Sequence, residues 1–428
     1  MKNAYSNVFF LAVLSLLGCE HVNSNYCEGA PHTNCKDLVD APIDGPPTGC
    51  KAMPSLCTGA TPACDMVADK CVECTVASHD LCTGVEPVCG TDQACRGCTA
   101  HSECASEVCL PDGSCAAEGD VAYVSGAGSG TACTKAAPCK TLTAAVTASK
   151  ATVKITGVTA EPASVTVGAV VRRVFGDAGA QITTATVAPI VLASANTNVE
   201  FHQVTIGNEP GIQPPACILI NNGTTATIKV FGGKIYGCQV GISNASSGGT
   251  VIVSGATITG NKGGGISVAN GSFKLTNNVI AENGDASAGG STFGGVSLTS
   301  TANDNVFEQN TVVFNHSLIG NPGASCSAVA AFHGRRNIIT SNNLGLTFPA
   351  SQSVGCADIE SYTAAGTSAN DLRFAAIAPA PINFHLTAAS PATVRDVAGL
   401  TTCTGGDIDG DARPINTLCD LGADEYKP

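Results

Sequence analysis

Three aspartates near the end of the chain have the types and spacing that most directly suggest chemistry. Asp407, Asp409 and Asp411 alternate in a loop that contains Gly410. Alternating carboxylates supply the hard oxygen ligands that Ca²⁺ prefers. The loop is not an EF-hand, because Leu418 stands where a bidentate glutamate would follow at the twelfth position. The sequence therefore predicts either a calcium site or a turn in which Arg413 pairs with these carboxylates, and it indicates no other cofactor.

The first 18 residues read as a targeting segment. A basic start at Lys2 and an apolar run over 8–17 are typical of a secretory signal, and the run is far shorter than the roughly 20 residues of a membrane-spanning helix. The junction Leu16-Leu17-Gly18-Cys19 resembles the lipobox of bacterial lipoprotein signal peptides. That resemblance implies a lipidated Cys19, and Glu20 after it favours the outer membrane and the cell surface. The alternative is an ordinary secretory signal, which would make the protein extracellular.

The cysteines predict disulfides rather than a metal site. The chain has 23, and removing Cys19 leaves an even 22, of which 14 lie in a block from Cys27 to Cys115. Two Cys-x-x-Cys pairs in that block would suggest zinc in a cytosolic protein, but behind an export signal they favour disulfides. The other eight fall in close pairs: Cys133 and Cys139, Cys217 and Cys238, Cys326 and Cys356, Cys403 and Cys419.

A short sequence motif recurs through the centre of the chain, and the repeated units that it marks must position the other residues. It reads Asn-x-(Ile/Val)-x-x-Asn at 278–283, 310–315 and 337–342, with looser copies at 203–208, 233–238 and 256–261. The copies begin 22 to 32 residues apart, which indicates a stack of similar units rather than one globular core. The runs between them are short and alternate apolar with polar residues, as half-buried strands do. Gly-Asn and Gly-Gly pairs separate the runs, and these residue types tolerate the positive φ of tight corners. We therefore predict a parallel β-helix; the alternative, an antiparallel sandwich, would not need asparagine at a coil-length period.

This repeat also predicts a register. Ile280, Val312 and Ile339 should stack inside successive coils, and the asparagines should form side-chain ladders along the axis. Because side chains alternate between the two faces of a strand, Val313 should point outward and tolerate substitution.

Two further segments carry resemblances. Tyr123-Val124-Ser125, followed by 138–145, resembles the entry of right-handed, pectate-lyase-like parallel β-helix domains, which implies a short helix over the first coil. Pro138 suits the first turn of that helix, and the Ala-rich run to Ala148 suits its body. The segments 383–391, 407–414 and 419–426 together resemble the choice-of-anchor tail that closes many secreted bacterial β-helix proteins. The predicted fold class is all-β, a right-handed parallel β-helix preceded by a small disulfide-rich module. The predicted organisation is a lipoprotein signal peptide at 1–18, a Pro-rich acidic tether at 19–49, a Cys-rich disulfide repeat module at 50–118, the β-helix at 119–347 and a C-terminal capping segment at 348–428.

The resemblance to β-helix proteins raises the question of catalysis, because that family includes polysaccharide lyases and hydrolases. The candidate catalytic residues are His333, Arg335 and Arg336, with Asp304 and Glu308 in the preceding coil. Lyases of this family pair a basic residue with calcium-binding carboxylates, and hydrolases use two carboxylates. The signatures of the pectin hydrolases and the calcium aspartates of the lyases are missing from the sequence. A solvated turn at Arg335-Arg336 is the alternative.

Composition limits the partners. A net charge of −13 argues against nucleic acids and anionic lipid surfaces, and aromatic residues make up 4% of the chain. Two hypotheses follow. The first is a lipid-anchored bacterial surface protein that displays a β-helix for a structural, adhesion or interaction role. The second is an enzyme that acts on an extracellular polysaccharide. In either case the expected partners are the membrane, through the anchor, and a polysaccharide or another surface protein.

Overall fold

The computed structural model describes residues 49–428 except 169–170, 210, 222, 224, 286, 288–290, 301, 329–331, 344–351, 357–360, 365–371, 377–382, 398 and 404. The signal peptide, Cys19 and the tether up to residue 48 lie outside the described residues. The chain divides into two compact units, 1–72 and 73–428. No helix among the described residues is both long enough and apolar enough to cross a bilayer.

The described part of the first unit is a small disulfide-bonded hairpin. It contains a 3-10 turn, η2 (Pro54–Leu56), and the antiparallel strands β1 (Ala63–Asp65) and β2 (Lys70–Val72). The disulfides Cys50–Cys64 and Cys57–Cys71 interleave across it. So little apolar surface is available here that covalent bonds must replace a core.

Two more copies of this pattern begin the second unit. Each has two interleaved disulfides, Cys74–Cys89 with Cys82–Cys95, then Cys98–Cys109 with Cys104–Cys115. The connectivity, which spacing alone left open, is first to third and second to fourth in every copy. Both Cys-x-x-Cys pairs therefore join neighbouring copies, and their sulfurs are not free to bind zinc. The elements are η3 (Val76–Leu81), β3 (Val88–Cys89), β4 (Cys95–Arg96), η4 (His101–Glu103) and η5 (Glu118–Asp120).

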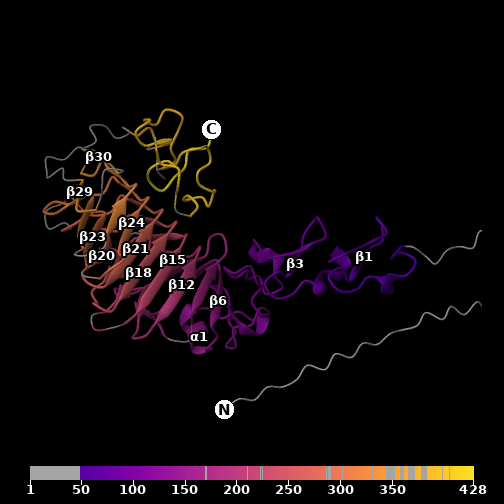
Figure 1. The fold of residues 1–428 in the computed structure, drawn as a ribbon. Coiled ribbons are helices and arrows are strands. Elements are labelled where there is room, and N and C mark those ends of the chain that lie inside the picture. Colours follow the sequence, from indigo (N-terminus) through magenta and orange to yellow (C-terminus); the bar gives the residue numbers. More distant parts are fainter. Residues whose placement is uncertain are drawn as a thin grey trace, which may run out of the picture. The chain divides into compact units, whose positions relative to one another are not determined.

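The rest of the second unit is a parallel β-helix of three sheets, which confirms the predicted fold class. The strands of one sheet lie side by side along the stack (Figure 1). The β7–β30 sheet contains β7 (Val158–Glu161), β10 (Gln181–Thr184), β13 (Thr205–Gly207), β16 (Lys234–Tyr236), β19 (Thr257–Thr259), β22 (Val279–Ala281), β25 (Thr311–Val313), β28 (Ile338–Thr340) and β30 (Tyr362–Ala364). The β8–β29 sheet contains β8 (Val165–Val167), β11 (Val191–Ala193), β14 (Ala216–Ile220), β17 (Val240–Asn244), β20 (Gly264–Val268), β23 (Val296–Ser300), β26 (Ala324–Ala328) and β29 (Ser353–Val354). The β5–β27 sheet contains β5 (Val121–Ser125), β6 (Thr152–Thr156), β9 (Arg173–Gly176), β12 (Asn198–His202), β15 (Thr227–Phe231), β18 (Thr250–Ser254), β21 (Ser272–Thr276), β24 (Val306–Glu308) and β27 (His333–Arg335).

The predicted interior register is confirmed. Ile280 pairs with Val312 and Val312 with Ile339, and all three side chains are fully buried in the main core. One asparagine ladder runs through Asn278, Asn310 and Asn337, and a second through Asn261, Asn283, Asn315 and Asn342. Each side-chain NH₂ in these rows donates to the next side-chain oxygen at 2.9–3.1 Å. The ladders satisfy the backbone groups of the corners, which would otherwise be buried without partners.

The corners bend at unexpected residues. The sequence predicts that glycine and asparagine take the left-handed conformation there, but in the later coils the residue before each ladder asparagine does so. Glu282 has φ +57°, Gln309 +54° and Phe314 +57°. Left-handed backbone costs a non-glycine residue about 1–2 kcal/mol, and the paired asparagine amides offset that cost.

The entry helix is shorter than predicted. The helix α1 (Leu142–Thr147) begins after Thr141, whose side chain accepts a hydrogen bond from the Ala144 N–H at 3.2 Å. Pro138 therefore precedes the helix rather than starting it. Leu142 and Ala145 are buried in the core at the first coil, as the resemblance implied.

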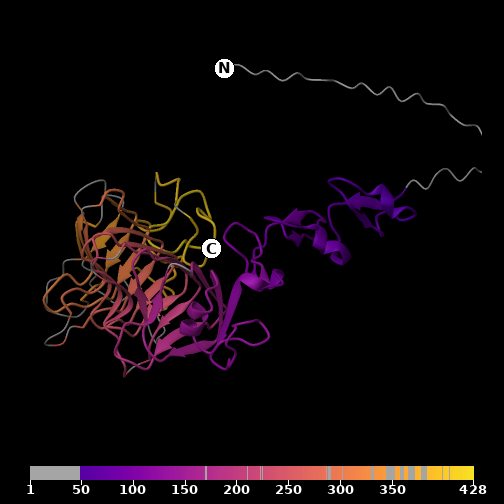
Figure 2. The same cartoon turned by 90° about the horizontal axis from the view of Figure 1, so that it is seen from below.

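The C-terminal tail differs most from expectation. The sequence predicts that it closes the end of the stack, but its described residues from Leu372 onward pack on the outer face of the β7–β30 sheet. Leu372, Phe374, Leu386, Leu400, Leu421 and Ala423 form a second core with Val279, Ala281, Val313 and Ile338. Both views show the tail, in yellow, beside the later coils (Figure 1 and Figure 2). Val313 is consequently fully buried, and the prediction that it tolerates substitution is wrong.

Candidate functional site

The five candidate catalytic residues do not converge on one point. Glu308 and Arg335 occupy paired positions on β24 and β27, and the Arg335 Nε lies 2.8 Å from the Glu308 Oε1. His333 stands in the neighbouring outward column, opposite Val306. Asp304 forms the left-handed turn before β24, at φ +64°. The structure thus brings together two of the five, as an ion pair between adjacent coils.

Arg336 belongs to the attachment of the tail rather than to this pair. Its side chain is buried, its φ is +59°, and its carbonyl accepts a hydrogen bond from the Gly422 N–H at 2.9 Å. Its position just before the ladder residue Asn337 makes it one of the corner residues.

The three candidate calcium ligands have separate partners. The Asp407 Oδ1 accepts hydrogen bonds from the backbone N–H groups of Asp409 and Asp411, at 3.0 and 2.8 Å. Asp411 forms an ion pair with Lys427 at 3.2 Å. Asp409 lies 2.9 Å from the His385 Nε2 and shares a cluster with His385 and Asp424.

Arg413 holds the tail motif together. Its side chain is fully buried, donates to the carbonyl oxygens of Gly422 and Asp424, and lies 3.3 Å from the Glu425 carboxylate. It also donates to the Asn277 side chain of the β-helix at 3.0 Å. Arg413 therefore pairs with a tail carboxylate, Glu425, and joins the tail to the stack.

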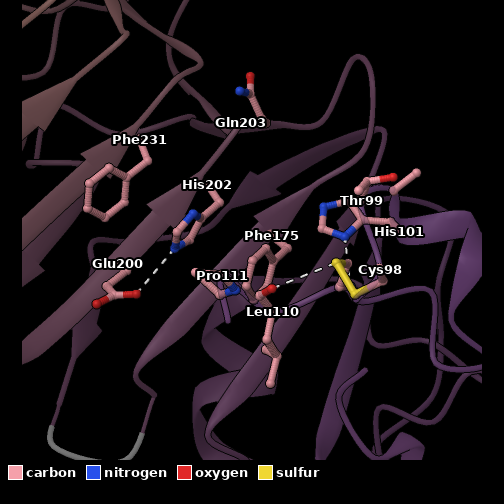
Figure 3. Close-up of a pocket in the computed structure, with 12 residues that line it drawn as sticks. Cys98, Thr99, His101, Leu110, Pro111, Phe175, Glu200, His202, Gln203 and Phe231 are labelled. Carbon is pink, nitrogen blue, oxygen red and sulfur yellow. Dashed lines mark hydrogen bonds and ion pairs between the residues drawn. A yellow bond between two sulfur atoms is a disulfide. The ribbon is translucent and has the colours of Figure 1, made fainter. Parts of the chain in front are cut away.

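Three cavities lie on the outer face of the early coils and beside the tail, and together they are called the groove. The first, of about 830 Å³, lies between the third Cys-rich copy and the β5–β27 sheet. Figure 3 shows Leu110, Pro111 and His101 of that copy facing Phe175, His202 and Phe231 of the sheet. A second cavity of about 360 Å³ shares His202, Gln203 and Phe231 with the first. A third of about 600 Å³ shares Gln203 and Asp409 with the second, so the three cavities adjoin one another.

The copy that covers the groove is docked by a small core of its own. Val108 and Ala116 pack with Val121, Tyr123 and Phe175. The Tyr123 hydroxyl donates to the Ser106 carbonyl at 2.8 Å, so the covering residues belong to the same compact unit as the β-helix.

An aromatic ladder lines the groove. Phe175, His202 and Phe231 occupy one outward column on β9, β12 and β15, with ring centroids 4.7 and 5.0 Å apart. The next position in that column is Ser254. The column therefore changes from an aromatic ring at Phe231 to a small side chain at Ser254. Both residues line the second cavity.

Glu200 is the charged centre of the groove. Its carboxylate lies 2.9 Å from the Lys229 Nζ, 3.3 Å from the His202 Nε2 and 3.4 Å from the Arg173 Nε. Although burial raises its pKa, the hydrogen bonds from Lys229 and His202 hold the pKa of Glu200 below its ordinary value. Burial lowers the pKa of His202 despite the adjacent carboxylate, and burial also lowers the pKa of His101. At neutral pH the site thus presents an ionised carboxylate and neutral imidazoles.

The asparagine-based repeat does not indicate this groove. Phe175, His202 and Phe231 differ in residue type, so the Asn-based repeat did not reveal them, although their spacings of 27 and 29 residues lie within the coil period. The coil period alone could have predicted that these three rings stack. No feature of the sequence predicts that a Cys-rich copy packs over them.

Fold and groove together define a class: a parallel β-helix protein with a disulfide-rich N-terminal region and a laterally attached tail. No family model matches the chain, and no curated protein matches it. Among solved structures, the crystal structure of pectate lyase Pel9A is similar, with a TM-score of 0.43 and 14% sequence identity over 72% of this chain and 96% of that one.

Proposed function

We propose that the chain is a lipid-anchored bacterial surface protein whose β-helix binds a neutral glycan in the groove without cleaving it. The observation that carries this proposal is the interruption of the aromatic ladder at Ser254, beside a cavity that Phe231 helps to line. A sugar ring can stack on Phe231 at the ladder spacing, because a pyranose has an apolar face and a thickness similar to that of an aromatic ring.

The rim of the groove suits hydroxyl groups. Gln203 borders all three cavities, and Asp407, Asp409 and Asn383 line the parts toward the tail. An apolar floor with a few polar groups at the edge is the usual composition of a small-molecule or oligosaccharide site. The groove also crosses several coils, so it can follow an extended chain.

Charge favours a neutral rather than an acidic glycan. Glu200, Glu282, Asp407 and Asp409 line the groove, against one lysine, Lys234, among the lining residues. The net charge of −13 adds a repulsive field for polyanions.

Glu200, at the centre of the groove, is poorly suited to act as a general acid. A glycosidase general acid needs a raised pKa, whereas the pKa of Glu200 is held low by Lys229 and His202. The acids whose pKa values burial does raise, Asp420, Asp424 and Glu425, belong to the tail and do not line the three cavities. These features support binding over the alternative, an extracellular polysaccharide lyase or hydrolase.

The test is binding of neutral and acidic oligosaccharides by calorimetry, with Phe231→Ala as the variant. Loss of an aromatic anchor should cost about 2 kcal/mol, roughly thirtyfold in Kd. Lys274→Ala is the matched control, since Lys274 is exposed on the same sheet but outside the cavities, and it should bind like the unaltered chain. If Phe231→Ala binds the oligosaccharide as tightly as the unaltered chain does, the groove is not the binding site. The appearance of new reducing or unsaturated ends would establish the enzyme instead.

The anchor is proposed from the Leu16-Leu17-Gly18-Cys19 junction, which lies outside the described residues. The ten disulfides among the described residues support an oxidising compartment, as expected for an exported protein. Multiple acyl chains on Cys19 would hold the protein stably in the outer membrane. Cys19→Ala should therefore move it from the membrane to the soluble fraction. Unchanged detergent partitioning of this variant would exclude the anchor.

A further inference from the structure

One cluster of metal-ligating side chains lies at the tail end of the groove. His385, Asp409 and Asp424 each present a ligand atom, and these atoms lie within 4.8 Å of one another. His385 and Asp409 also line the cavity of about 600 Å³, so the cluster can be reached from the groove. The three residues come from separate segments of the tail and meet because the tail folds back on itself through the Cys403–Cys419 disulfide and Arg413.

The buried member of the cluster points to a cation. Asp424 is 5% exposed, and its Oδ2 accepts one hydrogen bond, from the Leu386 N–H at 2.6 Å. Among the described residues, its other oxygen has no hydrogen-bond donor and the carboxylate has no ion pair. A buried carboxylate with so little compensation is costly unless a proton or a cation neutralises it.

We propose that His385, Asp409 and Asp424 bind one divalent transition-metal ion of the Zn²⁺ type. One imidazole nitrogen and two carboxylate oxygens match the ligands that zinc takes, whereas Ca²⁺ prefers oxygen alone. The proposed site differs from the calcium site predicted at Asp407, Asp409 and Asp411. It shares Asp409 with that site and adds a nitrogen ligand from His385. It does not depend on glycan binding.

The cluster can close to ligand distances. The side chains of His385 and Asp409 are 41% and 52% exposed and already in contact, so rotamer changes can bring them onto an ion. Asp424 stays fixed by its burial and by Leu386. Three protein ligands leave the fourth position of a tetrahedral ion open, and here that position is available to water or to a ligand oxygen from the cavity.

The test is calorimetric titration of the EDTA-treated full chain with ZnCl₂ and, separately, with CaCl₂. We expect one zinc ion bound per chain and calcium binding at least tenfold weaker. His385→Gln and Asp409→Asn should each lower zinc affinity by more than the about 10–100-fold that loss of an outer-shell partner costs. Because both residues are partly exposed, these variants should unfold at the same temperature as the unaltered metal-free chain, which shows that they are folded.

Asp411→Asn is the matched control, since Asp411 lies in the same loop but pairs with Lys427. It should bind zinc like the unaltered chain. Cobalt adds an independent reading, because Co²⁺ in a tetrahedral site gives intense visible absorption that His385→Gln should abolish. Zinc binding that is absent, or equal in His385→Gln, would overturn the proposal. Tighter calcium binding that Asp407→Asn or Asp411→Asn abolishes would also overturn it, in favour of the aspartate loop.

Discussion

Replacing Arg413 with methionine should destabilise the tail by about 3–5 kcal/mol, because removing one partner of a buried ion pair leaves the other charge uncompensated. The Arg413 side chain is fully buried 3.3 Å from the Glu425 carboxylate, which is itself 1% exposed. Burial already raises the pKa of Glu425 and that of Asp420. Without the guanidinium, Glu425 must either take up a proton or draw water into the tail.

The substitution also removes the hydrogen bonds to Gly422, Asp424 and Asn277. The last of these joins the tail to the β-helix. Limited proteolysis should therefore cleave Arg413→Met within the tail while the β-helix resists, and chemical denaturation should show an early transition for the tail.

Lys427→Met is the control for this experiment. It changes a cation to the same residue in the same segment, but the Lys427 side chain is 69% exposed and pairs with Asp411 at the surface. Surface substitutions of this kind usually change stability by less than about 0.5 kcal/mol. If Arg413→Met is no more protease-sensitive than Lys427→Met, the buried cluster does not hold the tail.

Aspartate at position 312 or at position 313 should be severely destabilising, but the two variants should damage different parts of the molecule. Val312 lies in the main core between Ile280 and Ile339. Val313 lies in the second core, between the outer face of the β7–β30 sheet and the tail. A carboxylate in either place is buried without a partner and costs several kcal/mol.

Hydrogen exchange distinguishes the two outcomes. Val312→Asp should raise exchange in the ladder strands β22, β25 and β28 and lower the stability of the whole stack. Val313→Asp should raise exchange in the described tail from residue 383 onward, because it disrupts the core between the sheet and the tail. The interior of the β-helix should stay protected. Thr299→Asp, at an exposed position of β23, should leave both regions protected. Tolerance of Val313→Asp would mean that the tail does not cover the sheet in solution.

The sequence by itself determined the stack. Asparagine at both ends of each repeated phrase, with a β-branched residue between, predicted the parallel coils, the interior column of Ile280, Val312 and Ile339, and the amide ladders. These features are local and periodic, because each coil repeats the same contacts with its neighbour, so one period in the sequence is enough to reveal them.

Tertiary structure alone decided what lies against the flanks of the stack. Alternation along a strand shows that Val313 points outward, but not that residues about 60 to 110 positions later cover it. The same holds for the groove, where residues 98–111 cover side chains of three successive coils, and for the meeting of His385, Asp409 and Asp424. Such contacts occur once, between segments with no shared period. They depend on how the complementary surfaces pack, and no spacing in the sequence encodes that.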